Sequence, residues 1–314
     1  MSDIPSAVIA VDGLNKHFPG VFALESVSFS IARGEIFGLV GPDGAGKTTL
    51  MRMCAGVMRP DSGQIVIDGV DVVQDPEQAK KHLSYMPQRF GLYEDLTVDE
   101  NIRFYADLFE IPPALRRTRS AELLAASGME EFRKRRAGLL SGGMKQKLGL
   151  ICSLVHTPRV LLLDEPTTGV DPVSRRDFWH ILYSLRETGV TIVISTAYLD
   201  EAERCTRLAL LHAGRIRYCD TPQRLKQRMP GALIKISSTE ARAARDAVAH
   251  LSGVTSTMLV GDGVHAVVDD AAIHIPEFQA VLAGKNIPVS GIERLTPSIE
   301  DLFVNLLGSQ ARAA

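Results

Sequence analysis

The segment GPDGAGKT, at residues 41–48, lies between an apolar segment, EIFGLV, and a helical pattern that begins at Lys47. Its spacing, G-x-x-x-x-G-K-T, lets backbone N–H groups turn around a phosphate, and the following helix directs its positive end there. We therefore expect a strand, a phosphate-binding loop and a helix. Lys47 would contact the β- and γ-phosphates of a nucleotide, and the Thr48 hydroxyl would ligate Mg²⁺. The predicted nucleotide-binding residues of this segment are Gly41, Pro42, Asp43, Gly44, Ala45, Gly46, Lys47, Thr48 and Thr49.

A second polar site follows the apolar segment VLLLDEP, in which Asp164 and Glu165 end the apolar run. Ligand sites of parallel sheets gather at the carboxyl ends of the strands, so this acidic pair should lie beside the phosphate-binding loop. There Asp164 suits Mg²⁺ coordination, and Glu165 is placed to act as general base for an attacking water. An apolar run that ends in Asp-Glu is a weak signal by itself, and it becomes strong only because a phosphate loop precedes it.

The segments upstream of the acidic pair alternate between strand and helix signals. Over residues 7–71 the β-type segments AVIAVDG, SVSFSIA, EIFGLVG and GQIVIDG are separated by Gly and Asp turn signals. Residues 97–154 have a helical pattern, which starts where Thr97 and Glu100 have the spacing of a capping box.

Two short apolar segments further along, 160–164 and 191–195, predict strands. The helical segment PVSRRDFWHILYSLRE lies between them. Strands in which apolar residues do not alternate with polar ones, and which are joined by a helix, indicate a parallel sheet that is covered on both faces. The fold class predicted for this part of the chain is therefore α/β.

The sequence changes character at residues 222–231, where Pro, Gly, Gln and Arg dominate. We place a domain boundary there, with one domain over residues 1–225 and an α+β accessory domain over 226–314. The order in the second domain is β-α-β-β-α-β, which is the ferredoxin-like succession, and a final helix is expected over SIEDLFVNLLG. A packing or docking role without chemistry is the simplest interpretation of this domain. The predicted elements are strands 232–237, 254–260, 264–268 and 287–292 and helices 239–251 and 275–283.

Composition and charge exclude several classes of protein. The hydrophobic fraction of 45% supports a folded core rather than disorder. A net charge of -2 gives no indication of a nucleic-acid partner. The four cysteines have no paired spacing and fit a reducing cytosol. The longest apolar stretches, such as residues 148–155, are shorter than the roughly 20 residues that span a bilayer.

The segment LSGGMKQ, at residues 140–146, lies between the phosphate loop and the acidic pair. With it, the first 225 residues or so resemble the nucleotide-binding domain of ABC transporters, whose LSGGQ-type signature is nearly diagnostic. Met144 stands here at the usual Gln position. The resemblance implies a P-loop NTPase fold of ABC type, with a parallel-sheet core, an antiparallel β subdomain and a helical subdomain.

The resemblance also implies roles for residues that the patterns alone would not single out. Phe18, in LNKHFPG, would stack on adenine, and Gln88, in YMPQ, would contact Mg²⁺ and the membrane partner. Asp171, in TTGVDP, would reach across a dimer. Ser141 and Gly143 would bind the γ-phosphate of ATP held by the opposite subunit, where a helix N-terminus adds its positive end. The implied catalytic residues are Glu165, Gln88 and Lys47, and the implied metal ligands are Thr48, Gln88 and Asp164.

The cofactors implied by this resemblance are ATP and Mg²⁺. The implied partners are an integral-membrane permease on a separate chain and a second nucleotide-binding domain, either another copy or a related ATPase. Such a subunit would lie in the cytoplasm, peripherally on the cytoplasmic face of the inner membrane. The SIEDLFVNLLG ending is similar to that of the bacterial drug-exporter branch with ABC-2-type permeases. The segments GPDGAGKTTLMRM and LSGGMKQKLGL look closest to the first half of exporters with two fused ATPase halves.

One position departs from the family pattern. ABC proteins carry a histidine after the last strand of the core, and alignment of ISTAYLDEAE places Ala197 there. A methyl group cannot donate a hydrogen bond to a γ-phosphate or an attacking water, so hydrolysis at this site should be slow, by about 10²- to 10⁴-fold. The neighbouring Tyr198 is long enough to reach inward, although tyrosines at such positions more often pack elsewhere.

Three functions are consistent with these features. The first is an ATP-hydrolysing subunit that energises export. The second, motivated by Ala197, is a regulatory subunit that holds ATP and hydrolyses little. The third is a soluble ABC protein that acts on ribosomes or DNA, but such proteins usually have two fused ATPase units, long coiled coils or basic arms.

Overall fold

The computed structural model describes residues 7–261 and 263–303. The chain divides into two compact units, one up to Asp220 and the other from Thr221 onward. Each unit has its own sheet system and its own apolar core. The predicted boundary after residue 225 falls inside a helix, α8 (Pro222–Gln227).

The first unit is built on a sheet with the strand order β10-β9-β3-β8-β7-β6. Its strands from β9 to β6 are parallel, and β10 runs antiparallel to β9. Strands β3, β7 and β8 are buried over their whole length, as their mostly apolar sequences, without alternation of polar and apolar residues, predict. The strands of this sheet are β3 (Ile36–Val40), β6 (Leu83–Met86), β7 (Val160–Asp164), β8 (Thr191–Thr196), β9 (Arg207–His212) and β10 (Arg215–Asp220).

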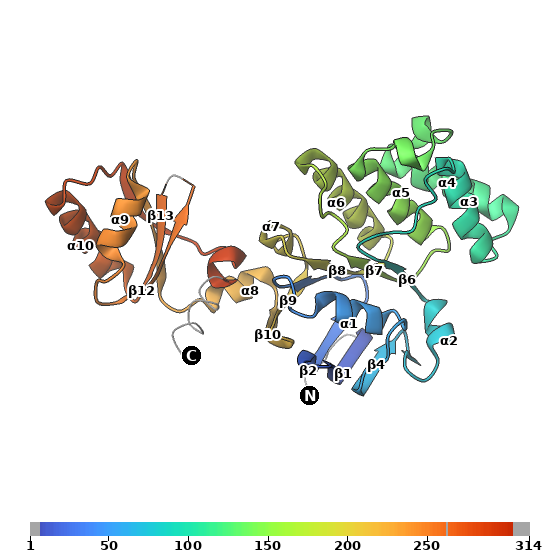
Figure 1. Cartoon of the computed structure of the whole chain (residues 1–314), viewed down its shortest axis with the longest axis horizontal. Helices are drawn as coiled ribbons and strands as arrows, with labels where there is room; N and C mark the ends of the chain where they lie inside the picture. Colours follow the sequence, from blue (N-terminus) through green and yellow to red (C-terminus); the bar gives the residue numbers. More distant parts are fainter. Residues whose placement is uncertain (1–6, 262, 304–314) are drawn as a thin grey trace. The chain divides into compact units, whose positions relative to one another are not determined.

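A second, antiparallel sheet lies on one side of the parallel sheet, with α1 (Lys47–Cys54) between the two (Figure 1). Side chains from both sheets and from α1 form a single core, in which Leu14, Phe37 and Leu50 are buried. This is the antiparallel β subdomain that the resemblance implies. Its strands, in spatial order, are β2 (Val21–Ala32), β1 (Ala7–Phe18), β4 (Ser62–Ile67) and β5 (Val70–Asp71).

Helices cover the opposite face of the parallel sheet (Figure 1). Leu150 of α5 and Trp179 of α6 pack there against β-strand side chains such as Ile192. Helices α3 and α4 form a layer with α5 that has its own apolar cluster, and α3 begins at the predicted capping box of Thr97 and Glu100. The helices of this unit are α2 (Pro76–Lys80), α3 (Val98–Leu108), α4 (Pro113–Ser127), η1 (Glu130–Phe132), η2 (Ala137–Leu139), α5 (Gly142–Leu154), α6 (Pro172–Glu187) and α7 (Leu199–Ala202).

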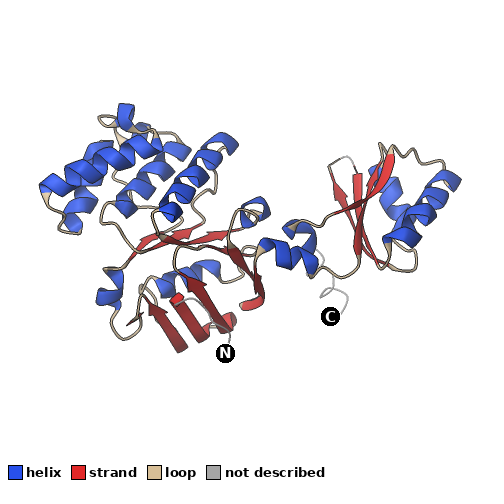
Figure 2. Ribbon diagram, turned by 180° about the vertical axis from the view of Figure 1, so that it is seen from behind, coloured by secondary structure: helices blue, strands red, loops and turns tan. Residues whose placement is uncertain are grey.

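The second unit has a four-stranded antiparallel sheet in the order β12-β13-β11-β14. Both of its longer helices lie on one face of this sheet (Figure 2), and their side chains share a core with the strands. The chain order β-α-β-β-α-β and this strand order together confirm the ferredoxin-like prediction. The elements are β11 (Ala232–Ser237), α9 (Ala241–Val248), β12 (Val254–Val260), β13 (Gly263–Val268), α10 (Ala271–Gly284) and β14 (Gly291–Leu295).

Three elements in the second unit were predicted with wrong bounds, and one of them is α10, which begins at Ala271 and not at residue 275. The last strand begins at Gly291, not at residue 287, because Pro288 lacks the N–H that a ladder needs. The helix predicted over 239–251 is shorter, since α9 begins after Glu240 and ends at Val248. Residues 299–303 are helical, and the rest of the predicted final helix lies outside the described residues.

Within residues 7–261 and 263–303, no helix combines the length and the apolar character that a bilayer crossing requires.

Candidate nucleotide-binding site

The phosphate-binding loop connects the end of β3 to the start of α1, as predicted. Gly46 caps α1 with a left-handed φ of 106°, which favours glycine over other residues. A Cβ at Gly46 would lie 2.5 Å from the carbonyl oxygen of Ala23, and one at Gly41 would lie 2.2 Å from that of Leu211. The two outer glycines of the pattern are therefore required by close backbone contacts. The first turn of α1 holds no acidic residue that would repel a phosphate.

The Lys47 side chain is buried at the head of α1. Its ammonium donates hydrogen bonds to the carbonyl oxygens of Gly41 (2.9 Å) and Pro42 (3.1 Å). It also forms an ion pair with Glu165, with Nζ 3.0 Å from Oε1. These three contacts match the three donors of an ammonium group. A phosphate that approaches Lys47 must therefore take the place of one of these acceptors.

Glu165 follows β7 directly and is held from several sides. Gln88 Nε2 donates to its Oε2 at 3.1 Å, and the Glu165 backbone N–H donates to Oγ of Ser195 at 2.9 Å. Its φ of 49° is unusual for a residue with a side chain and costs on the order of 1–3 kcal/mol. Such a conformation persists only where neighbours impose it, and here Lys47, Gln88 and Ser195 provide those contacts.

The Asp164 carboxylate is fully buried beneath the pocket and accepts hydrogen bonds from three hydroxyl groups. Thr48 Oγ1 (3.2 Å) and Ser195 Oγ (2.6 Å) contact its Oδ1, and the Tyr85 hydroxyl (3.2 Å) contacts its Oδ2. Burial first, and then the neighbouring Asp164 charge, raise the pKa of Tyr85, so that this phenol remains a proton donor at neutral pH. Thr48 and Asp164 thus bring together the oxygen donors that Mg²⁺ prefers, next to the phosphate loop.

Lys47, Thr48, Gln88 and Glu165 border a cavity of about 660 Å³, a size ordinary for a small-molecule site. Phe18, at the end of β1, lines the cavity beside Val21 and is 37% exposed. The cavity brings together nearly all the residues that the sequence singled out on the phosphate side. Its lining residues are Phe18, Val21, Ala23, Asp43, Gly44, Ala45, Gly46, Lys47, Thr48, Thr49, Gln88, Glu165, Thr168, Ala197 and Tyr198.

Six predicted site residues do not line this cavity. Gly41, Pro42 and Asp164 lie next to it and contact the lining residues Lys47 and Thr48, whereas Ser141, Gly143 and Asp171 lie elsewhere. Ser141 caps α5 and Asp171 caps α6, each by accepting hydrogen bonds from backbone N–H groups of its helix. The two caps are neighbours, because a Cβ at Gly143 would lie 2.5 Å from the side chain of Ser174 in α6. The Ser174 hydrogen bonds lower the pKa of Asp171, so its carboxylate is ionised at neutral pH. The predicted site residues therefore fall into two separate groups.

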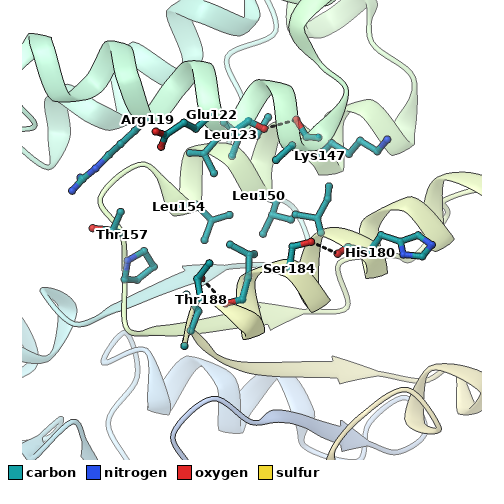
Figure 3. A pocket seen from close by; sticks show the side chains of 18 of the residues that line it. Arg119, Glu122, Leu123, Lys147, Leu150, Leu154, Thr157, His180, Ser184 and Thr188 are labelled. Carbon is teal, nitrogen blue, oxygen red and sulfur yellow. Dashed lines mark hydrogen bonds between the residues drawn. The ribbon is translucent and has the colours of Figure 1, made fainter.

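A larger cavity, of about 1150 Å³, lies between α4, α5 and α6 (Figure 3). Leu150 and Leu154 of α5 lie in the middle of its lining, and Arg119 and Lys147 lie toward opposite ends. No residue of the phosphate loop or of the acidic pair is among the described residues that line it. Its larger volume therefore does not make it the better candidate for a nucleotide, because the phosphate-binding chemistry lies elsewhere.

Comparisons with known proteins agree with this assignment of the pocket. A family profile described as ABC transporter matches residues 24–168. The chain is 32% identical to the daunorubicin/doxorubicin resistance ATP-binding protein DrrA of Streptomyces peucetius, over 99% of this chain and 96% of that protein. The chain belongs to the family of ABC transporter ATP-binding proteins.

Other relatives place this ABC protein near multidrug transporters. It is 44% identical to the probable multidrug ABC transporter ATP-binding protein YbhF of Escherichia coli, over 96% of this chain and 52% of that protein. It therefore spans about half the length of this relative. Among solved structures, it resembles the dimeric bacterial ABC transporter cassette MJ0796 with a TM-score of 0.62 and 25% identity, over 68% of this chain and 98% of the cassette.

Sequence reasoning missed several residues of this ABC site. Ser195 and Tyr85 contact the Asp164 carboxylate, and Thr168 Oγ1 lies 3.5 Å from Glu165 Oε2. The sequence could have indicated Ser195, since it is a polar residue near the carboxyl end of an apolar parallel strand. No sequence pattern indicated Tyr85, because its contact with Asp164 depends on the pairing of β6 with β7.

Proposed function

We propose that this ABC protein hydrolyses ATP to drive drug export through a membrane permease on another chain. The observation that supports this most is the convergence of Lys47, Glu165 and Gln88 in one pocket that also borders the Thr48–Asp164 pair. The resistance and multidrug names of its relatives favour drugs as cargo. The subunit would lie on the cytoplasmic face of the membrane, where ATP is available.

ATP would enter with its terminal phosphates at Lys47, which then exchanges the Glu165 carboxylate for phosphate oxygens. Glu165, released from this ion pair but still bonded to Gln88, would accept the proton of the attacking water. Phe18 would stack on the adenine ring. Mg²⁺, held by Thr48, Asp164 and Gln88, would neutralise charge on the transferring phosphoryl group.

A second nucleotide-binding domain, either another copy or a related ATPase, would complete the site. Ser141 and Gly143 lie outside the pocket, at the N-terminus of α5, where backbone N–H groups and the helix dipole favour a phosphate. Asp171 lies beside them. This half-site fits the γ-phosphate of ATP that is bound in a partner domain. ATP would then bind the two domains together, and hydrolysis would release them.

The test of this function is ATP binding and Mg²⁺-dependent ATP turnover by the purified chain, alone and with a co-purified polytopic membrane protein. We expect ATP binding in both preparations and faster turnover with the membrane protein. A chain that does not bind ATP would contradict the proposal. Turnover that the membrane protein leaves unchanged would favour a regulatory role.

Ala197 motivates that second candidate, a regulatory subunit that holds ATP and hydrolyses slowly. Ala197 is exposed in the pocket that contains Glu165 and Lys47, and its methyl group offers no hydrogen bond. If the histidine that the family pattern implies at this position supplies ordinary orienting or acid–base help, Ala197→His should raise turnover by about 10²- to 10⁴-fold.

The measurement is the turnover number of Ala197→His beside Ala121→His, a histidine added at an exposed position of α4. We expect the control to behave like the unmodified chain. An Ala197→His variant without any gain would show that the missing histidine does not limit this site.

A further inference from the structure

The carboxylate of Glu201, in α7, is fully buried close to the nucleotide pocket. Its Oε1 accepts a hydrogen bond from Thr167 Oγ1 at 2.7 Å, and its Oε2 accepts one from Thr196 Oγ1 at 2.8 Å. Arg175, in the first turns of α6, adds Nε and Nη2 at 3.3 Å from Oε1. The Arg175 guanidinium therefore balances the charge of this buried carboxylate, and each of its oxygens accepts a hydrogen bond.

The partners of Glu201 belong to three segments that surround the reaction. Thr167 lies in the loop after β7, two positions beyond Glu165. Thr196 ends β8 and directly precedes Ala197. Arg175 lies in the same helix that Asp171 caps. The Glu201 carboxylate thus connects three segments: the one that contains the proposed base, the one that continues into Ala197, and the helix proposed to face the partner domain.

Arg175 also contacts the pocket wall directly. Its guanidinium lies 4.2 Å from the centroid of the Tyr198 ring, a cation–π geometry, and Tyr198 lines the nucleotide pocket. The Tyr198 backbone N–H donates to Thr196 Oγ1 at 3.0 Å. Arg175 and Thr196 therefore hold Tyr198 through its side chain and its backbone, next to Ala197.

We propose that Glu201 and Arg175 are positioning residues that make these three segments move as one unit. Through them, closure of a partner domain at Asp171 would be transmitted to Glu165 and to the 196–198 loop. This inference rests on the proposed function, because it concerns coupling within the same ATP site. Neither residue lines the pocket, so neither acts on ATP directly.

A simple role in stability explains the arrangement less well. Buried ion pairs commonly contribute little net stability compared with apolar side chains of similar volume. The Arg175 guanidinium is moreover part-exposed, with 20% of its side-chain area accessible. What this pair provides instead is a fixed geometry among the three segments that carry Thr167, Thr196 and Arg175.

The first test compares Arg175→Met with Arg176→Met. Methionine keeps most of the side-chain length, and Arg176 is an exposed neighbour in α6. For Arg175→Met we expect kcat to fall by about 10- to 100-fold, since a misplacement of roughly 1 Å can cost that much. The KM for ATP should stay within about twofold, and Arg176→Met should match the unmodified chain. Arg175→Lys, which retains the charge, should recover part of the lost kcat.

The second test uses Trp179, the single tryptophan of the chain, as a probe that needs no hydrolysis. Trp179 follows Arg175 by one helical turn, and its ring lies 5.8 Å from the guanidinium carbon of Arg204. ATP should change its emission in the unmodified chain and in Arg176→Met. Arg175→Met should bind ATP with similar affinity but lose this response.

These readouts separate the inference from the function on which it rests. A loss of kcat together with the emission response, at retained ATP affinity and melting temperature, supports the inference. It is overturned if Arg175→Met behaves like Arg176→Met, or if its ATP affinity and melting temperature fall in parallel with kcat. An unmodified chain that binds no ATP overturns the proposed function as well, and that result is visible before any variant is made.

Discussion

Replacing Lys47 with alanine is expected to weaken ATP binding by about 10- to 100-fold and to reduce turnover to background. The ammonium would provide charge-assisted hydrogen bonds to the phosphates, each worth about 1.5–3 kcal/mol, and a factor of ten in affinity corresponds to about 1.4 kcal/mol. The substitution also leaves the Glu165 carboxylate without its cation, at a position where only 11% of its side-chain area is exposed. Titration with a fluorescent ATP analogue and a phosphate-release assay measure the two effects.

Lys80→Ala is the matched control for this experiment. Lys80 lies at the end of α2, where it pairs with Glu77 on the surface, and it does not line the nucleotide pocket. It should leave affinity and turnover unchanged. If Lys47→Ala retained full affinity and full turnover, the assignment of residues 41–48 as the phosphate-binding loop would be wrong.

Replacing Glu165 with glutamine should separate ATP binding from hydrolysis. The amide cannot accept a proton from water at neutral pH, so kcat should fall by about 10²- to 10⁴-fold. ATP affinity should be retained or increased, because Lys47 no longer forms an ion pair that the phosphates must replace. ATP should then hold two domains together for longer, and size-exclusion chromatography with ATP should show a dimer.

The control is Glu187→Gln, at the exposed C-terminal end of α6, which should hydrolyse ATP like the unmodified chain. Undiminished turnover in Glu165→Gln would show that another group accepts the proton. Loss of ATP binding in that variant would instead show that the Lys47–Glu165 pair maintains the shape of the pocket.

The sequence predicted best those features that depend on short-range patterns. The strand at residues 160–164 and the helix at 172–187 occur at the predicted residues, because a fully apolar run and a Pro at the first helical position act locally. The ferredoxin-like order of the second unit followed from periodicity and turn signals. The start of its last strand was not predicted, because the apolar residues near Pro288 join the core from a segment of irregular backbone that precedes the strand.

On its own, the sequence indicated the phosphate loop, because its glycine spacing and lysine form a pattern within a few residues. It indicated the acidic pair only because a phosphate loop precedes that pair in the chain. Only the tertiary structure decided what surrounds them. Tyr85 and Ser195 reach Asp164 because β6, β7 and β8 are neighbours in the sheet. Likewise, Glu201 connects segments that the sequence leaves unrelated, and contacts of this kind depend on strand order and register, which no local pattern encodes.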